Sequence, residues 1–260
     1  MDPNAPSPTC VTLWIGPSLG RVERACLRSA MRQGHPVALY CYDEVAGVPD
    51  GVEVRDAAQI LPRELIAGRP VSPALFANHF RYRLLAQGLG VWIDADVYCL
   101  APLARDEETL LFGWQSEGRI NNAVLRLPPD SPVLTPLLEL MDEQTPPAWA
   151  SPEEQAAMRE RLSRTGRIGL EQGPWGIAGP LAVTATAQAF GLAGAAQPRD
   201  VFYPVHWRFA TWLRKPGIRL DHFCTDRTRA AHLWNEIIKP FKDQPAEKGS
   251  FLARLQEEGA

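Results

Sequence analysis

Two short apolar runs enclose one helix near the start of the chain, and this order constrains the fold more than any other feature. Residues 11–15 form the first run and residues 35–42 form the second. Between them Ser18 can cap a helix that extends to about Gln33 and stops at Gly34. A strand, a helix and another strand predict a right-handed parallel unit, so we expect an α/β fold built on a central sheet.

A further apolar run, residues 90–93, ends in two carboxylates, Asp94 and Asp96, separated by one residue. Side chains two residues apart lie on the same side of an extended backbone, so both acids can converge on one cation. Open α/β sheets bind ligands beyond the carboxyl ends of their strands, where these acids would lie. The alternative is a solvated turn, but paired acids repel each other unless a cation neutralises them. Oxygen ligands favour Mg²⁺ or Mn²⁺, which bind through few protein groups plus diphosphate oxygens.

The helix before this strand carries a polar pair. Ser72 precedes Pro73, the favoured order of a cap residue and a first helical residue, and the periodic pattern continues to about Gly88. Asn78 and Arg81 are three residues apart and are therefore neighbours on one side of this helix. The sequence thus predicts a polar helix surface immediately before the acidic strand.

The rest of the chain predicts smaller elements and two polar ends. Residues 1–10 are expected to form a disordered tail, residues 11–238 one domain, and residues 239–260 a polar tail. A polar turn through Asn121 and Asn122 should separate two strands that extend the sheet. The expected strands cover residues 110–114, 123–127, 201–206 and 230–234, the expected helices cover residues 131–144, 151–163 and 180–190, and a glycine-rich loop covers residues 169–179.

Composition narrows the possible classes of protein. The chain has 260 residues, of which 45% are hydrophobic, enough for the core of one large domain. A net charge of −3 gives no electrostatic reason to expect nucleic acid or an anionic membrane as the main ligand, although local basic patches are compatible with it. Five scattered cysteines without a CxxC pair argue against a disulfide framework and a structural zinc site. With no signal peptide and no transmembrane run, we expect a soluble cytoplasmic protein.

Six separated motifs cover most of residues 11–238. They are Leu13-Trp14-Ile15-Gly16, Asn78-x-x-Arg81, Trp92-Ile93-Asp94-Ala95-Asp96, Asn121-Asn122, Gly179-Pro180 and Ala231-His232-Leu233-Trp234-Asn235. In order and spacing they resemble the GT-A glycosyltransferases with a DXD sugar-binding region, which include α-1,4-galactosyltransferases and N-acetylglucosaminyltransferases and, distantly, the clostridial glucosylating toxins. The resemblance implies a GT-A type, Rossmann-like nucleotide-diphospho-sugar transferase fold with a mixed central sheet flanked by helices.

The resemblance also implies roles for single residues. The donor nucleotide sugar would be bound by Trp14, Ile15, Asn78, Arg81, Trp92, Asp94, Trp234 and Asn235, the metal by Asp94, Asp96 and His232, and the reacting sugar would be approached by Asp94, Asp96, Asn122 and Gln172. Three of these residues have a plain alternative. Trp14 can belong to a core strand, Asn122 to a turn, and a lone histidine such as His232 on an apolar segment is commonly a packed core group.

The activity implied by the resemblance is the transfer of a hexose or N-acetylhexosamine from a nucleotide-diphosphate sugar, expected to be a UDP-sugar, to an acceptor hydroxyl with retention. The cofactor would be Mn²⁺ or Mg²⁺, and the acceptor a glycan or another hydroxyl compound. Many relatives are membrane-anchored, so peripheral association with a glycan-assembly complex at the inner face of a membrane stays open.

Two rival functions also stay open. Asp94-Ala95-Asp96-Val97 fits the nucleophile motif of haloacid-dehalogenase-type phosphatases, but these enzymes need a later lysine and acidic pair, and residues 97–201 contain no lysine. A non-catalytic nucleotide-sugar-binding protein with the same fold is the second rival.

Overall fold

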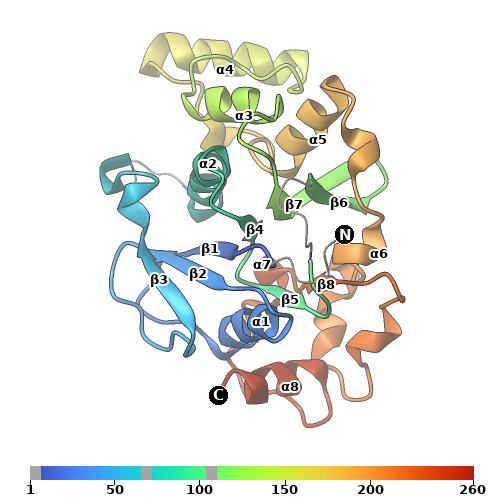
Figure 1. Ribbon diagram of the computed structural model, residues 1–260. Helices are drawn as coiled ribbons and strands as arrows, with labels where there is room; N and C mark the ends of the chain where they lie inside the picture. Colours follow the sequence, from blue (N-terminus) through green and yellow to red (C-terminus); the bar gives the residue numbers. More distant parts are fainter. Residues whose placement is uncertain (1–6, 66–71, 104–109) are drawn as a thin grey trace.

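A six-stranded mixed sheet forms the centre of the molecule (Figure 1). The computed structural model describes residues 7–65, 72–103 and 110–260. The strand order is β3-β2-β1-β4-β7-β6, in which the first four strands are parallel to one another and β7 runs antiparallel to both of its neighbours, β4 and β6. Their bounds are Cys10–Trp14 (β1), Val37–Cys41 (β2), Val52–Asp56 (β3), Val91–Ile93 (β4), Leu111–Ser116 (β6) and Arg119–Arg126 (β7). This arrangement is consistent with the Rossmann-like fold expected from the sequence.

A second, two-stranded sheet pairs β5 (Val97–Cys99) with β8 (Ala230–His232) in antiparallel order. The α-helices are α1 (Arg21–Arg32), α2 (Pro73–Ala86), α3 (Leu134–Met141), α4 (Pro152–Thr165), α5 (Pro180–Ala189), α6 (Arg199–Phe202), α7 (Asn235–Ile238) and α8 (Phe251–Glu258). The 3₁₀ helices are η1 (Ala57–Gln59), η2 (Arg63–Leu65), η3 (Leu170–Gln172), η4 (Ala193–Ala195), η5 (Trp207–Arg214) and η6 (Leu220–His222). Among the described residues, none of these helices has the length and apolar character needed to cross a bilayer.

Strands β1, β2 and β4 are largely buried on both faces, which explains why they are almost continuously apolar, whereas the edge strand β3 is polar and partly exposed. Successive side chains of β2 alternate between two cores: Leu39 belongs to the core beneath α1 and α8, whereas Tyr40 belongs to the core beneath α2, α3 and α5. The same alternation places Val91 in the first core and Trp92 in the second. Figure 1 shows the resulting layers, with α1 and α8 on one side of the sheet and α2 to α5 on the other.

Three expected elements differ from the structure for identifiable reasons. Helix α1 begins at Arg21 and not after Ser18, because residues 18–19 pair instead with Ala46, whose carbonyl accepts from the Leu19 N–H at 2.9 Å. The expected strand at 201–206 is wrong: this chain is the end of α6 and a loop, and Pro204 within it cannot donate to a sheet. Asn121 and Asn122 lie inside β7, because the turn before them needs only two residues.

The polar tail expected at residues 239–260 is wrong for its last part. Residues 251–258 form α8, which Ser250 caps by accepting the N–H of Ala253 at 3.1 Å. Phe251, Leu252 and Leu255 are buried against α1 and β5. The charged residues between these apolar positions concealed the helical stripe in the sequence. Of the tail expected at residues 1–10, residues 1–6 lie outside the described residues, and Cys10 already begins β1.

The packing of α8 leads us to expect that this segment, which the sequence suggested to be a polar tail, contributes to the stability of the fold. Phe251 is 4% exposed, and its ring meets the Tyr98 ring edge-on with centroids 5.5 Å apart. We expect Phe251→Ala to lower the free energy of unfolding by about 3–5 kcal/mol, because it removes this buried ring. Urea denaturation measures the change. Phe190→Ala is the matched control, since Phe190 is 47% exposed and should change the value by less than about 0.5 kcal/mol. Equal values for the two variants would contradict the packing of α8.

His35 predicts a pH dependence of stability. It is 2% exposed; its Nδ1 donates to the Pro8 carbonyl at 2.9 Å, and its Nε2 accepts the Leu103 N–H at 3.0 Å, so the ring is neutral. Burial lowers its pKa, and the Pro8 bond opposes this only in part. Because the folded-state pKa lies below the unfolded one, protonation favours unfolding. We expect the free energy of unfolding to fall below a pH of about 6.5.

The comparison that isolates this effect is urea denaturation of the wild-type protein and of His35→Gln between neutral and acidic pH. The difference in stability between the two proteins should shrink as the pH falls, because only the wild type has this imidazole to protonate. A difference that stays constant with pH would exclude His35 as the source.

Candidate metal and ligand site

The order of the strands reverses at β1, which lies between β2 and β4. Helix α1 leads from β1 to β2 over one face, whereas α2, which leads into β4, lies on the other face. Open α/β sheets bind ligands at such a reversal, beyond the carboxyl ends of the strands. Trp14 and Ile15 lie at the end of β1, and Asp94 follows the end of β4.

The acids Asp94 and Asp96 converge through a tight turn and not, as expected, through an extended strand. The Val97 N–H donates to the Asp94 carbonyl at 2.9 Å, which closes the turn between β4 and β5. On one side the Asp94 N–H donates to Ala123 of β7 at 2.8 Å, which continues the main sheet. On the other side β5 pairs with β8 and places Val97 opposite His232. The turn therefore joins the two sheets and brings the late histidine to the acids.

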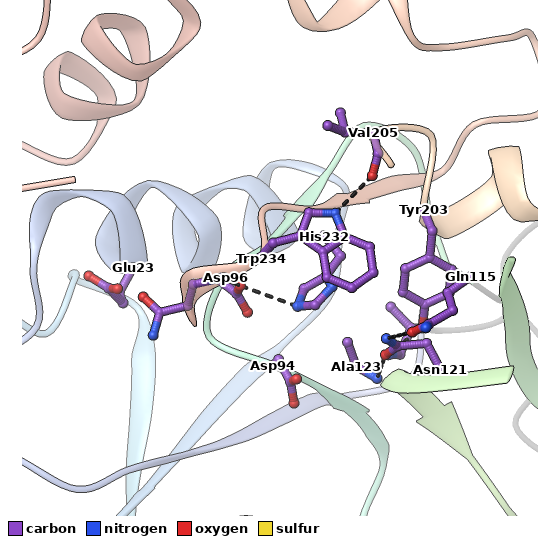
Figure 2. A network of polar contacts seen from close by, with 12 residues as sticks. Glu23, Asp94, Asp96, Gln115, Asn121, Ala123, Tyr203, Val205, His232 and Trp234 are labelled. Carbon is purple, nitrogen blue, oxygen red and sulfur yellow. Dashed lines mark hydrogen bonds and ion pairs between the residues drawn. The ribbon is translucent and has the colours of Figure 1, made fainter. Parts of the chain in front are cut away.

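Asp96 is 6% exposed and is held by groups from the C-terminal part of the chain (Figure 2). Its Oδ2 accepts the Asn235 N–H at 2.7 Å and lies 3.2 Å from His232 Nε2. Burial alone would raise the pKa of Asp96, but the charge and hydrogen bond of His232 and the Asn235 N–H outweigh it, so the pKa lies below its usual range. Burial likewise opposes the charged form of His232, but Asp96 raises the histidine pKa above its usual value.

Asp94 is paired with Arg81, a contact that was not predicted from the sequence. The Arg81 Nη2 and the Trp92 Nε1 both donate to Asp94 Oδ1, at 2.6 and 2.7 Å. The guanidinium of Arg81 also lies over the Trp92 ring, 4.6 Å from its centroid. Each carboxylate therefore has a cationic partner within the protein, so the inference that the acid pair requires a metal for neutralisation is too strong. The Asp94 side chain is 29% exposed, and its second oxygen is free of hydrogen bonds to the described residues.

Asn78 and Asn122 extend this pairing toward helix α5. The Asn78 Oδ1 accepts from Arg81 Nη1 at 2.8 Å and from Asn122 Nδ2 at 2.9 Å. Gly179, the residue before α5, lies so close that a Cβ there would be 3.2 Å from the Asn78 amide nitrogen. The Gly-Pro step thus borders the site. Asn121 instead faces β6, where its amide donates to Gln115 at 2.5 Å (Figure 2).

Asp94, Asp96 and His232 can offer ligands to one metal ion. One ligand atom from each lies within 4.8 Å of the other two. The His232 ring packs against the Trp234 ring with centroids 4.4 Å apart and the planes tilted by 54°, and its Nδ1 is buried without a hydrogen-bond partner among the described residues. Two carboxylates and one imidazole form a mixed oxygen and nitrogen set, which fits a divalent transition metal. The sequence had left His232 open between ligand and core group, and the structure brings it to the acids.

Trp234 has a left-handed backbone with φ 62°, which is uncommon for a residue with a bulky side chain. Its indole N–H donates to the Val205 carbonyl at 2.8 Å. This conformation lets the next residue, Asn235, direct its N–H to Asp96. Such strain persists only where the surroundings hold it, and it is concentrated at functional sites.

The remaining expected residues lie at the edge of the site or away from it. Trp14 is partly buried, and its indole N–H lacks a hydrogen-bond partner among the described residues, whereas Ile15 is 50% exposed. Gln172 is exposed in η3 beside Gly169. Within the described part of the chain no hydrogen bond joins Gln172 to the acids.

Sequence reasoning missed a buried ion pair behind the site. Lys242 Nζ forms an ion pair with Glu23 and donates to Asn235 Oδ1 at 2.7 Å. The Lys242 and Glu23 side chains are 10% and 2% exposed. Asn235 in turn donates its N–H to Asp96, so a chain of polar contacts links α1 to the acids. The signal in the sequence was the position of Glu23 on the same apolar helix face as Leu27.

Comparison with known proteins adds little. No family model matches the chain, and no curated protein does. Among solved structures, the glycosyltransferase PaToxG aligns with a TM-score of 0.38 and 12% sequence identity, over 73% of this chain and 78% of that chain. A likeness at this level does not bear on fold or activity, which therefore rest on the geometry described above.

The buried pair behind the site predicts an asymmetric effect of mutation. Lys242→Met leaves the Glu23 carboxylate buried without its cation, so we expect a loss of about 3–5 kcal/mol in the free energy of unfolding. The double variant Glu23→Gln/Lys242→Met should recover much of this loss, because it removes both charges. Lys239→Met is the control, since Lys239 forms only an exposed pair with Glu236. Thermal or urea denaturation measures the free energy of unfolding of each variant. A loss for Lys242→Met no larger than that for Lys239→Met would contradict the buried charge pair.

Proposed function

We propose that this protein is a metal-dependent glycosyltransferase of GT-A type. It would transfer a hexose or N-acetylhexosamine from a nucleotide-diphosphate sugar, expected to be a UDP-sugar, to an acceptor hydroxyl with retention. The observation that carries the proposal is the convergence of Asp94, Asp96 and His232 beyond the carboxyl end of β4, next to the point where the strand order reverses. The six sequence motifs that led to this expectation supply these three residues and several of their neighbours.

The donor set favours Mn²⁺ as the ion. Asp94, Asp96 and His232 would hold it, and a nitrogen ligand beside the two carboxylates favours a transition metal over Mg²⁺. When bound, the ion would supply positive charge that stabilises the diphosphate as a leaving group. The polar groups already in place fix these ligands: Arg81 orients Asp94, and the Asn235 N–H orients Asp96.

The remaining residues would bind the donor and its sugar. Trp14, with its free indole N–H, and the exposed Ile15 would form the nucleoside pocket at the end of β1. Trp92 would support Arg81, and Trp234 and Asn235 would approach the diphosphate.

The donor sugar would be contacted by two further residues. Asn122 would lie beside the sugar, and Gln172, which is exposed in η3, would approach the reacting carbon of the sugar. With retention, the leaving diphosphate can accept the proton of the acceptor hydroxyl, so a separate protein base is not required.

The proposal predicts that metal and nucleotide sugar stabilise the protein together. We expect UDP-sugars to raise the melting temperature in the presence of Mn²⁺ and to have little effect without it, because the ion links the diphosphate to the acids. In Asp96→Asn the ligand-induced shift should be lost. Differential scanning fluorimetry measures the shift, and hydrolysis of the effective donors in the presence of metal follows as the test of activity. Asp43→Asn, which alters an exposed acid paired with Arg63, is the matched control.

Three results would argue against this function. Equal shifts for wild type and Asp96→Asn would exclude the metal role of that acid. Phosphatase turnover without any sugar donor would favour the haloacid-dehalogenase alternative. Metal-linked binding of a donor without hydrolysis or transfer to any acceptor would favour a non-catalytic binding protein.

A further inference from the structure

The helix η5 exposes three aromatic side chains, Trp207, Phe209 and Trp212, which we call the aromatic patch. Their exposed fractions are 42%, 40% and 38%. Phe209 and Trp212 are in contact, with ring centroids 4.7 Å apart. Phe209 and Trp212 are three residues apart and so share one side of this 3₁₀ helix, whereas the buried Ala210 and Leu213 anchor η5 on the core. Large apolar side chains that gather on one exposed face commonly mark an interaction site.

The same segment is strongly basic. Residues 206–219 contain four cations, Arg208, Arg214, Lys215 and Arg219, and no acid, in a chain whose net charge is −3. Arg208 lies over the Trp207 ring at 5.0 Å, and Lys215 over the Trp212 ring at 5.3 Å. Among the described residues only Arg219 of these four forms an ion pair, with Asp221. Arg208 and Lys215, and Arg214 over the nearby Phe241 ring at 5.1 Å, are therefore unpaired with any carboxylate of the described residues.

We propose that the aromatic patch docks on the surface of membranes that contain anionic lipids. Tryptophan is enriched at membrane–water interfaces because its ring is apolar and its N–H is polar. Arginine and lysine beside such rings can reach the negative head groups while their methylene stems cover apolar surface. A face of rings framed by unpaired cations matches the surface of an anionic bilayer in both polarity and charge. A soluble anion would use the charges but leave the three rings in water.

The patch is joined to the candidate site by short connections. Val205, two residues before Trp207, accepts the indole N–H of Trp234, whose neighbour Asn235 binds Asp96. Helix η5 also packs against α7 and α8. Docking would hold the site next to the lipid surface. That an acceptor hydroxyl is then lipid-linked rests on the proposed function; the docking itself does not.

Vesicle flotation tests the docking without metal or nucleotide. The probes are phosphatidylcholine vesicles with and without phosphatidylglycerol. We expect the wild-type protein to float with the anionic vesicles only and to be released by high salt. Each cation near a lipid surface contributes about 1 kcal/mol, so Arg208→Gln/Arg214→Gln/Lys215→Gln should lower the partition coefficient on the order of 100-fold. Trp207→Ala/Phe209→Ala/Trp212→Ala should abolish flotation.

Controls separate docking from general effects of charge or folding. Phe190→Ala removes an exposed ring elsewhere, and Arg63→Gln/Arg159→Gln/Arg164→Gln removes three exposed cations elsewhere; both should float as the wild type does. Circular dichroism checks that every variant is folded. As a second readout, lipids brominated in their acyl chains should quench the fluorescence of the wild-type protein, and Trp207→Phe/Trp212→Phe should lose most of this quenching.

Several results would overturn the proposal. They are no flotation with anionic vesicles, equal flotation of patch and control variants, or self-association of the wild-type protein that the aromatic variant abolishes and vesicles do not displace. The metal-linked donor shift is measured without vesicles. If the protein fails to float but keeps the donor-induced shift in melting temperature, only the docking proposal is wrong. If it floats but shows no donor-induced shift, only the glycosyltransferase proposal is wrong.

Discussion

The site depends on how the charge of one buried carboxylate, Asp96, is compensated. A carboxylate removed from water is costly unless hydrogen bonds and opposite charge replace its hydration. His232 and the Asn235 N–H supply both, and the Asp96 carbonyl also accepts the Leu233 N–H at 3.0 Å. Backbone and side chain of one residue thus tie the turn after β4 to the strand β8. This compensation acts together with the backbone pairing of β5 and β8, which also holds the second sheet at the turn.

The contacts that stabilise Asp96 continue outward through a series of polar and charged side chains. Asn235 is fixed by Lys242, and Lys242 is neutralised by Glu23 of α1. On the other side of the turn, Asp94 is neutralised by Arg81, whose second nitrogen binds Asn78. The acids are therefore held from both layers of helices. Their geometry is set by the protein before any ligand arrives, which is the preorganisation that efficient ligand binding requires.

Much of the architecture follows from local pattern, and the exceptions have physical causes. The strand before Asp94 and the capped helix from Pro73 were predictable because each carries its own apolar period and end signals. The start of α1 was not, since a distant partner, Ala46, competes for the preceding residues. The helix α8 was not, because its burial depends on a surface of α1 that no local pattern reveals.

The candidate site likewise contains residues that local sequence pattern predicts and residues that only the folded structure reveals. Asp94, Asp96 and Arg81 could be singled out from sequence because the acids follow an apolar run with one residue between them and Arg81 lies on the helix before that run. Lys242 and Glu23 could not be paired, since each looks like an ordinary solvated charge until the fold removes water from both. The role of Asn121 was equally hidden: only the register of β6 and β7 shows that it faces Gln115 and not the acids.

The pairing of Asp96 with Asn235 spans 139 positions of the chain. Contacts of such long range are formed late in folding, because a large loop must close before they contribute. The six strands of the main sheet all precede β8, so they can pair while the acids still lack their histidine and their amide. The site would thus stay incompetent for its ligand until residues 230–235 have joined β5 and Asp96.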